Sequence, residues 1–299
     1  MTNPIRLSYS SLETLNVCER KFQIEKLLDN NFQKEESAHT LFGKAFGAGV
    51  QSYFQHQDQD KALFDCWITY YPEEEIEGKK TVMRSLIALQ KCFPSLDNLL
   101  MEYELVSFEG KPAVELSFRL DIDEEYYFVG YVDLVLRHRF TGQYVVLDVK
   151  TTGLNLLDLS PLYKNSGQAL GYSITLDQIV GHELSEYGVI YLVAQLGKTL
   201  ADCKLHTYHF DKSLLDRLNW FITLGLDVER LKRMHQLNSF PMRGSSCLQY
   251  MKPCRHFGTC NLKVFDRPKE PEEDLIEYQF TYQLDDVIED HLRRIGNVD

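Results

Sequence analysis

Four charged side chains fall in predicted strands, at positions from which they could act together. Asp148 and Lys150 are two positions apart in an apolar stretch, so both side chains point to the same face of a strand. Asp133 interrupts an earlier apolar stretch, and Glu115 alternates with apolar residues further upstream. Charged groups seldom occur in such strands unless they are paired or bind a metal ion. These four groups are therefore candidates for one site at the edge of a sheet.

This set of groups suits the hydrolysis of a phosphodiester. Carboxylates supply hard oxygen ligands for Mg²⁺ or Mn²⁺, and paired ions can stabilise both the attacking and the leaving oxygen. An ammonium group beside them can orient the water and neutralise the charge that develops. The plainer alternative is that Asp133, Asp148 and Lys150 form salt bridges at strand ends on a solvated face.

A second set of chemically active residues consists of cysteines. Cys247, Cys254 and Cys260 are separated by six and five residues, and Cys18 lies near the start of the chain. A loop of this kind can direct three thiolates toward one metal centre, with the fourth ligand coming from elsewhere. Two alternatives stay open: a structural zinc site, in which His256 could replace one thiolate, and free thiols.

The composition is that of a folded protein that stays inside the cell. The chain has 299 residues, enough for one large or two small domains, and 44% of them are hydrophobic. It has no apolar run of about 18 residues and no hydrophobic N-terminal signal segment. We therefore expect no membrane span and a cytoplasmic location, in a bacterium or a phage-infected host cell. In a reducing cytoplasm, cysteines indicate metal binding or buried thiols rather than disulfides. The thiols in apolar patterns, which we expect to be buried, are Cys66, Cys92 and Cys203.

The net charge of −12 argues against tight nonspecific binding to nucleic acid, because phosphate contacts need Lys and Arg. The charge is uneven, however. Residues 266–299 contain 11 acidic and 4 basic residues, a balance of −7 that leaves −5 for residues 1–265. A site for divalent cations must itself hold carboxylates, whose charge the bound cations offset. Acidity therefore does not exclude a nuclease, and the absence of a P-loop motif indicates that the chain has no ATP-driven motor of its own.

Hydrophobic periodicity divides the chain into a helical first part and a mixed second part. Ser10 and Glu13 form a predicted capping box at the start of the first helix. Further helices are predicted at 40–54, 61–71 and 79–92, with Pro72 and Pro94 as breakers. Strands follow at 99–108, 113–122, 126–138 and 143–151, the last two joined by a hairpin turn at Thr141-Gly142. The remaining predicted elements are a helix at 167–180, strands at 187–195 and 204–210, and a helix at 212–237.

This order of elements predicts an α/β fold with a mixed central sheet flanked by helices. We expect three parts: a helical N-terminal part at 1–98, a core at 99–238, and a cysteine-bearing segment with an acidic tail at 239–299. Within the tail, residues 278–284 alternate weakly, so the tail could add a strand or a helix or could be a mobile flap.

The order of several short motifs points to a known family. The segments Gly130-Tyr131-Val132-Asp133 and Leu147-Asp148-Val149-Lys150-Thr151 resemble the G-x-(I/V)-D and (V/L)-D-x-K-T signature of RecB-like nucleases of the PD-(D/E)xK superfamily. Gln168 and Tyr172 match the Q-x-x-x-Y motif of that family and would share one helix face. The resemblance runs in order from about Leu7 to Cys260. It implies a restriction-endonuclease-like core and a metal-dependent DNA nuclease, and the family favours an exonuclease.

The resemblance also implies a role for each matched residue. Asp133 and Asp148 would bind Mg²⁺ or Mn²⁺, with Glu115 as a further ligand or a group that positions water. Lys150 would stabilise the transition state. In the family, the residues that correspond to Gln168 and Tyr172 border the active site and approach the DNA.

One position departs from the family pattern. The family usually has a G-x-x-x-H motif on an early helix, and its histidine is a metal ligand. Here Gly43 is followed by Gly47 where that histidine would stand. The departure leaves three possibilities: the carboxylates suffice, another residue substitutes, or the enzyme is impaired.

The cysteines match a second feature of related nucleases. One cysteine before the core and three after it resemble the split [4Fe–4S] site of AddB-type and CRISPR-adaptation nucleases, and the chain also resembles phage exonucleases. The family spacing of the last three is C-x2-C-x5-C, whereas Cys247 and Cys254 are separated by six residues here. Such a cluster would act as a structural staple between Cys18 and the C-terminal segment.

The sequence therefore predicts a deoxyribonuclease that uses Mg²⁺ or Mn²⁺ and carries a structural [4Fe–4S] cluster. Its expected partners are DNA and a helicase or another recombination or processing protein. Two rivals remain: an inactive nuclease-fold protein that binds DNA or acts as a scaffold, and a zinc-stapled regulator.

Overall fold

The computed structural model describes residues 4–28, 38–70, 81–154, 158–199, 202–249, 252–262 and 276–296. Its described residues belong to two compact units. The first, which we call the carboxylate unit, comprises Glu35–Leu116 and Tyr131–Arg217; the second, the cysteine unit, comprises Met1–Lys34, Ser117–Gly130 and Leu218–Asp299. Strands β5 (Val114–Asp121) and β6 (Tyr126–His138) pass from one unit into the other.

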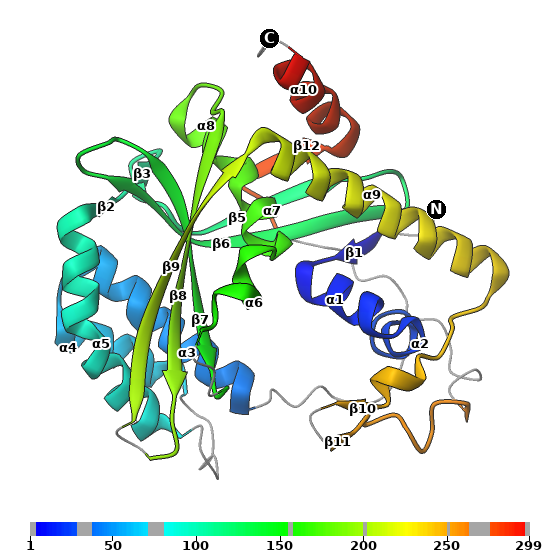
Figure 1. The fold of residues 1–299 in the computed structure, drawn as a ribbon, viewed down its shortest axis with the longest axis horizontal. Coiled ribbons are helices and arrows are strands. Elements are labelled where there is room, and N and C mark those ends of the chain that lie inside the picture. Colours follow the sequence, from blue (N-terminus) through cyan, green and yellow to red (C-terminus); the bar gives the residue numbers. More distant parts are fainter. Residues whose placement is uncertain are drawn as a thin grey trace. The chain divides into compact units, whose positions relative to one another are not determined.

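The carboxylate unit contains a mixed sheet, shown in Figure 1. Strand β6 pairs antiparallel with β7 (Tyr144–Thr152), β7 pairs parallel with β8 (Glu186–Leu196), and β8 pairs antiparallel with the edge strand β9 (Cys203–Ser213). Gly142, at a φ of 75°, lies in the tight turn between β6 and β7, which confirms the predicted hairpin. The unit's other strands are β2 (Tyr103–Leu105), which pairs with β6, β3 (Ser107–Phe108) and β4 (Lys111–Pro112).

Helices cover both faces of this sheet. On one face, Leu147, Ile190 and Leu192 pack in a core with residues of three long helices. On the other face, Val189 and Val193 pack with residues of short helices that follow β7. The fold is therefore α/β with a mixed sheet flanked by helices, as predicted. The long helices are α3 (Ala38–His56), α4 (Gln59–Ile68) and α5 (Val82–Glu102); the short ones are α6 (Ser160–Lys164), α7 (Gly167–Tyr172), η2 (Ser173–Thr175) and α8 (Leu176–Val180).

Helix α5 corrects the prediction that Pro94 ends a helix. The helix continues to Glu102, so the predicted strand from residue 99 begins only at Tyr103. Pro94 itself is exposed, while Phe93, Leu96 and Leu99 are buried on either side of it. The apolar face continues past the proline, and its packing outweighs the lost backbone hydrogen bond.

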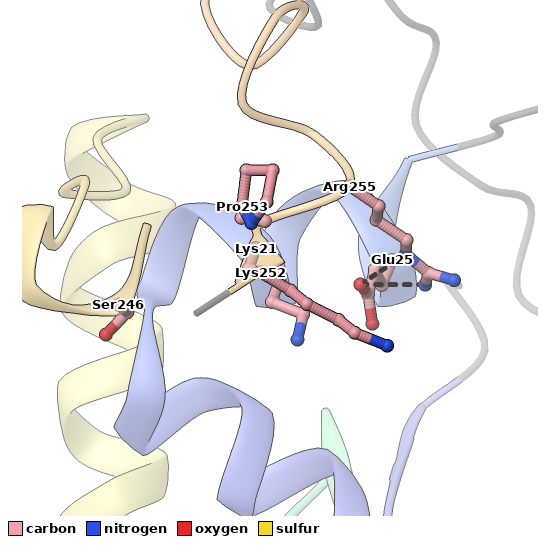
Figure 2. Close-up of a pocket in the computed structure, with 7 residues that line it drawn as sticks. Lys21, Glu25, Ser246, Lys252, Pro253 and Arg255 are labelled. Carbon is pink, nitrogen blue, oxygen red and sulfur yellow. Dashed lines mark hydrogen bonds and ion pairs between the residues drawn. The ribbon is translucent and has the colours of Figure 1, made fainter. Parts of the chain in front are cut away.

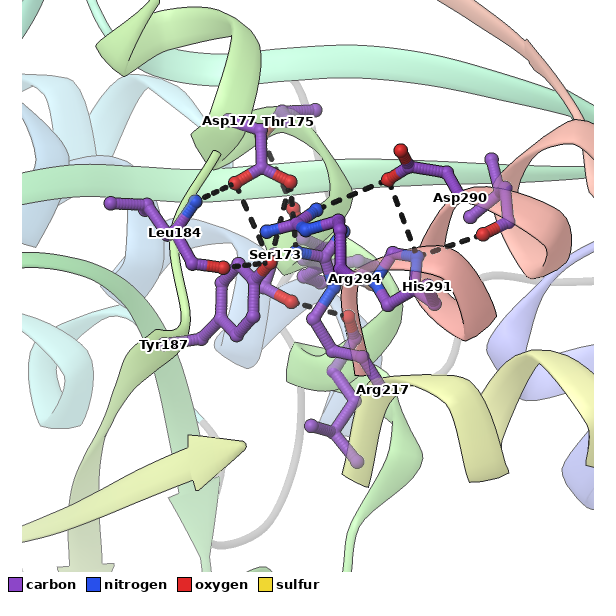
Figure 3. Close-up of polar contacts among 12 residues, drawn as sticks. Ser173, Thr175, Asp177, Leu184, Tyr187, Arg217, Asp290, His291 and Arg294 are labelled. Atoms are coloured by element: carbon purple, nitrogen blue, oxygen red, sulfur yellow. Dashed lines mark hydrogen bonds and ion pairs between the residues drawn. The ribbon is translucent and has the colours of Figure 1, made fainter. Parts of the chain in front are cut away.

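A buried ion pair anchors the last helices of the carboxylate unit. Arg217 is 1% exposed, and its Cζ lies 3.9 Å from the centroid of the Tyr187 ring. Its Nη1 is 3.3 Å from Asp177 Oδ2. Asp177 Oδ1 also accepts a hydrogen bond from the backbone N–H of Leu184 at 2.9 Å (Figure 3). These contacts hold α8 against the start of β8.

The cysteine unit combines the two ends of the chain with the hairpin of β5 and β6. Strand β1 (Ile5–Leu7) pairs parallel with β6, and β12 (Phe280–Gln283) pairs parallel with β5. The weakly alternating tail segment therefore forms a strand, followed by α10 (Leu284–Gly296), where Asp290 pairs with Arg294 (Figure 3). The remaining elements are α1 (Tyr9–Val17), α2 (Glu19–Phe22), η1 (Gln23–Leu27), α9 (Leu214–Leu237, shared with the other unit), η3 (Gly244–Ser246), β10 (Leu248–Gln249) and β11 (Lys252–Pro253).

The start of α1 corrects a second local prediction. The capping box is formed by Ser8 and Ser11, not by Ser10 and Glu13. The Ser8 backbone N–H donates to Ser11 Oγ at 2.8 Å, and the Ser11 N–H donates to Ser8 Oγ at 3.4 Å. A serine at the third helical position thus replaces the more usual Glu or Gln. The predicted division into 1–98, 99–238 and 239–299 stays a prediction.

None of the helices in the described ranges combines the length and apolar character that a transmembrane span requires.

Candidate active site

The last paired residues of β6 and β7 bring two carboxyl groups together. The antiparallel ladder ends where Leu134 pairs with Leu147, so the next residues on the two strands are Asp133 and Asp148. Asp133 Oδ2 accepts a hydrogen bond from the backbone N–H of Val149 at 2.8 Å. The side chain of Asp133 is therefore held against β7, directly beside Asp148.

Burial strongly disfavours charge on this pair. Asp148 is 1% exposed, and burial raises its pKa, although Lys150 opposes the change. Burial also raises the pKa of Asp133, to about 8, and the nearby charge of Asp148 adds to the increase. The hydrogen bond from Val149 and the charge of Lys150 act in the opposite direction but do not cancel it. Two adjacent carboxylates in such a place need a cation before both can ionise at neutral pH.

Lys150 supplies part of that positive charge. Its Nζ lies 2.7 Å from Asp148 Oδ2, and its side chain is 31% exposed, so the ammonium faces both the carboxylate and solvent. Apart from Lys150, the described part of the chain offers neither carboxylate oxygen of Asp148 a hydrogen-bond donor. A buried carboxylate whose one donor is a single ammonium retains oxygen lone pairs for a metal ion.

Glu115 lies at the start of β5 in a strained backbone conformation. Its φ is 49°, in the left-handed region that residues with a Cβ seldom adopt. The side chain is exposed, and Oε1 accepts a hydrogen bond from Gln51 Nε2 at 2.5 Å. The charge of Glu115 contributes, as the last of several causes, to the raised pKa of Asp133. Glu115 is thus within electrostatic reach of Asp133.

Sequence reasoning did not single out Gln51. It follows Gly47 by one helical turn on α3, so the helix face that carries the expected histidine position also holds the partner of Glu115. A Cβ at Gly47 would meet no atom within 4 Å, whereas at Gly43 it would lie 3.8 Å from Thr151 Oγ1. The helix therefore passes close to the end of β7, and Gly47 faces open space. The Gly-x-x-x-Gly spacing was the available signal for this face.

Gln168 and Tyr172 are brought together on α7, as the motif predicts. Gln168 Nε2 donates to the Tyr172 hydroxyl oxygen at 2.7 Å, and Tyr172 is 8% exposed. Burial raises the pKa of Tyr172, and the charges of Asp148 and Asp133 raise it further. The tyrosine therefore lies in the field of both aspartates and stays protonated, able to donate a hydrogen bond.

The four cysteines of the second constellation all lie in the cysteine unit. Cys18 is buried between α1 and α2, and the other three are half-buried. The Cys254 backbone N–H donates to the Cys247 carbonyl oxygen at 2.8 Å. Burial raises the pKa of the Cys260 thiol, and the nearby thiols of Cys18 and Cys254 add to the increase. These segments from the two ends of the chain are thus neighbours.

Charged and polar side chains make direct contacts between these segments. Arg20 Nη2 donates to the Cys260 carbonyl oxygen at 2.9 Å. Arg243 forms a bidentate ion pair with Glu19, whose side chain is 3% exposed. Ser246 Oγ donates to the Val17 carbonyl oxygen at 2.5 Å.

A cavity of about 430 Å³ opens beside Cys254 (Figure 2). Three cations and one carboxylate line it, and Arg255 Nη2 lies 2.7 Å from Glu25 Oε1. His256 is buried with its Nε2 3.1 Å from the same oxygen, so this nitrogen faces Glu25 rather than the thiols. The lining residues are Lys21, Glu25, Ser246, Lys252, Pro253, Cys254 and Arg255.

Neither constellation forms a ready-made cage for a metal. Within the described ranges, no three side chains of His, Cys, Asp or Glu are grouped closely enough to hold a metal ion. For Mg²⁺ this is compatible with binding, because that ion commonly uses one or two carboxylates and keeps several waters. The Asp133–Asp148 pair meets that requirement. An iron–sulfur cluster needs four thiolates, and the thiols here do not converge into such a group.

A comparison with known proteins assigns the family. A family model of the PD-(D/E)XK nuclease superfamily matches residues 6–277, so the chain belongs to this superfamily. No curated protein matches the sequence.

Two solved structures are similar to the chain at low identity. A proposed exonuclease from Eubacterium rectale is 14% identical over 85% of this chain and 92% of that one, with a TM-score of 0.47. SSO0001 is 12% identical over 77% of this chain and 78% of that one, with a TM-score of 0.31. The family assignment rests on the match of the family model alone.

Proposed function

We propose that this superfamily member is a metal-dependent deoxyribonuclease whose reaction takes place at Asp133, Asp148 and Lys150. The observation that carries the proposal is the buried carboxyl group of Asp148 next to the half-buried Asp133, with the Lys150 ammonium 2.7 Å from Asp148. In a purely structural salt bridge, the Lys150 ammonium would pair with Asp148 and would only partly offset the increase in the pKa of Asp133. A site for a divalent cation accounts for both aspartates.

Each of the candidate residues would have its own role in hydrolysis. Asp133 and Asp148 would hold Mg²⁺ or Mn²⁺, which when bound lowers the pKa of water and polarises the phosphate. Lys150, half in solvent, would neutralise charge that develops on the phosphate oxygens. Glu115, held by Gln51 at the exposed side, would orient the attacking water.

Gln168 and Tyr172 would position the DNA strand. Their mutual hydrogen bond fixes the tyrosine hydroxyl beside the aspartates. We propose an exonuclease rather than an endonuclease on the strength of the sequence resemblance. Because the chain has no P-loop motif, an enzyme of this kind would depend on free DNA ends or on a separate helicase.

The test uses two forms of the same plasmid. With Mn²⁺, the wild-type chain should degrade linearised plasmid and leave the covalently closed circle intact, and EDTA should stop the reaction. Asp148→Asn and Lys150→Met should each lower the rate by about a thousandfold or more, because each removes a group that acts on the transition state. Cleavage by purified Asp148→Asn at the wild-type rate would refute the assignment. Cleavage of the closed circle would replace the exonuclease by an endonuclease.

We also propose that Cys18, Cys247, Cys254 and Cys260 hold a structural [4Fe–4S] cluster. The support is their order in the sequence and the backbone contacts that bring both chain ends together, and the thiols would have to turn toward one another to bind it. Anaerobically purified protein should be brown and contain iron, and Cys18→Ser should be colourless. Zinc in a colourless wild-type preparation would favour the zinc-stapled alternative.

A further inference from the structure

A row of side chains leads from the carboxylates to the edge of the sheet. Asp148 on β7 pairs in register with Tyr191 on β8, and Tyr191 pairs with Tyr208 on β9. The next row in register contains Lys150, Val193 and His206. Residues that pair laterally point to the same face, so Tyr208 and His206 share the face of Asp148 and Lys150. Two strand spacings separate Tyr208 from Asp148, a distance of about 10 Å.

The exposed edge strand repeats a pattern of cations and aromatic rings on this face. Its alternate residues are Lys204, His206, Tyr208, Phe210 and Lys212. The opposite face of the same strand carries Cys203 and Leu205, which pack against the long helices. The pattern therefore belongs to the face of the catalytic candidates.

The rings on this face form a continuous stacked surface. Tyr163 of α6 lies 4.9 Å from Tyr191, with the planes 29° apart, and 5.9 Å from Tyr208. His206 lies 6.1 Å from Tyr208 with the planes only 14° apart. Tyr191 is 1% exposed and belongs to the core, whereas the other three rings are half-buried and offer area to solvent. Burial and Tyr208 raise the pKa of Tyr163, and the charge of Asp148 contributes, so this ring lies in the field of the carboxylate.

Hydrogen bonds hold two of these rings in fixed orientations. Gln195 Nε2 donates to the Leu154 carbonyl oxygen at 2.7 Å, which leaves its Oε1, 3.1 Å from His206 Nε2, as an acceptor. His206 Nε2 must therefore carry the proton that it donates. The Tyr208 hydroxyl oxygen accepts from the Leu159 backbone N–H at 3.1 Å. These rings are pre-organised, which reduces the entropy lost on stacking with a ligand.

We infer that Tyr163, Tyr208 and His206 form a stacking platform for the bases of a single DNA strand that enters the site across β9. Base–aromatic stacking tolerates any sequence, because every base has a π face. Lys204 is two residues from His206 on β9, and Lys164 follows Tyr163 in α6; both are exposed and would contact phosphates of the same strand. A duplex keeps its bases stacked on each other and cannot use such a platform. The inference rests on the proposed nuclease function and specifies a single-stranded end as the substrate.

Binding is measured first, in EDTA so that no cleavage occurs. The probes are fluorescein-labelled dT12 and an abasic 12-mer of tetrahydrofuran sites, which has the same phosphates but no bases. The wild-type chain should bind dT12 about tenfold or more tightly than the abasic strand, and more tightly than a blunt hairpin duplex. Equal affinity for dT12 and the abasic strand, or tighter binding of the duplex, would overturn the inference. This comparison needs no variant, so it does not depend on whether a substitution folds.

Variants then locate the platform. Tyr163→Leu with Tyr208→Leu should reduce the preference for dT12 over the abasic strand to about one. Tyr208→Phe keeps the ring and loses only the hydrogen bond from Leu159, so it should keep the preference. Phe140→Leu, a matched control at a ring that is 83% exposed outside the platform, should change nothing. An unchanged preference in a folded double variant would contradict the assignment of these rings.

Lys204→Ala should behave differently from the tyrosine variants. It should weaken both strands equally and lower the slope of log affinity against log salt by about one, because it removes one phosphate contact. An effect on dT12 alone would contradict a phosphate role for this lysine.

A small phosphodiester separates this inference from the proposed function. Methyl p-nitrophenyl phosphate has no nucleobase, so its hydrolysis by the wild-type chain with Mn²⁺ reports on the carboxylate site without any contribution from base stacking. If the wild-type chain binds dT12 with the expected preference but never hydrolyses this ester or DNA, the nuclease proposal fails while the platform stands. If it hydrolyses the ester without a preference for bases, the platform fails alone.

Discussion

The two units of this chain assemble their reactive residues in opposite ways. In the carboxylate unit, the half-buried Asp133 and the buried Asp148 come from neighbouring strands of one hairpin, and their charges are only partly compensated. In the cysteine unit, Cys18 and Cys260 come from distant parts of the sequence, and complementary charged groups such as Glu19 and Arg243 join their segments. The first arrangement lowers the stability of the folded protein but provides reactive groups, whereas the second raises that stability. The comparison predicts opposite responses to substitution.

The largest effect should come from neutralising one charge in each unit. Asp148→Asn should abolish nuclease activity and leave the unfolding temperature of the metal-free protein unchanged or higher, because it removes repulsion between buried carboxylates. Glu19→Gln should keep most of the activity and lower the unfolding temperature by a few degrees, because it breaks an ion pair between a buried carboxylate and the half-exposed Arg243. Calorimetry and DNA cleavage on the same samples check both. A destabilised Asp148→Asn would show that the carboxylates are structural.

Divalent cations should stabilise the Asp148→Asn and Glu19→Gln variants to different extents. Mn²⁺ at a hundredfold excess over its dissociation constant should stabilise the wild-type chain by about 2.7 kcal/mol. Asp148→Asn, which lacks one ligand, should gain little, while Glu19→Gln should gain as much as the wild type. Thermal unfolding over a Mn²⁺ titration measures this. An equal increase in stability of all three proteins on adding Mn²⁺ would show that the cation does not bind at Asp148.

The pH dependence of stability should sharpen the contrast further. The pKa of Asp133 is raised from its ordinary value near 4 to about 8 in the folded chain. The folded state thus holds this proton more tightly than the unfolded state, so its contribution to stability is present at low pH and is lost as pH rises through about 8. Metal-free wild-type protein should therefore lose stability from about pH 5 to 8 more steeply than Asp133→Asn. Denaturant melts in EDTA at several pH values test this, and parallel curves would contradict it.

The smallest expected effect concerns the position where the family has a histidine. A Cβ at Gly47 has open space around it, so Gly47→His should fold without strain. By the family resemblance the new imidazole should tighten Mn²⁺ binding several-fold, whereas Gly47→Ala should not. Isothermal titration of both variants compares them. Tighter binding of Mn²⁺ by Gly47→Ala would show that the effect comes from stabilising the helix rather than from a new metal ligand.

Local patterns predicted the parts of the site that depend on one or two strands. The spacing of Asp148 and Lys150 placed both on one face, and the Thr141-Gly142 turn set β6 beside β7, which brings Asp133 to Asp148. The fold class followed from the order of elements. These features depend on chain neighbours and could therefore be derived from the sequence.

Features that depend on register between distant segments could not be derived in this way. The row from Asp148 to Tyr208 requires the pairing of three strands, and no local pattern states which residues of β8 and β9 meet. The hydrogen bond between Gln51 and Glu115 likewise joins a helix to a strand 64 positions away. Packing against residues distant in the sequence also explains why α5 continues past Pro94.

The composition of the cysteine unit has a consequence for synthesis on the ribosome. This unit needs the first residues of the chain, the β5–β6 turn and the residues from Leu218 onward, whereas the carboxylate unit is complete at Arg217. A growing chain can therefore begin to form the carboxylate site before the residues that pack with its N-terminal segment, including Cys18, have been synthesised. Its buried acidic groups would exist before the ends of the chain are joined, so a truncated product lacking the last segment should be captured by chaperones or proteases.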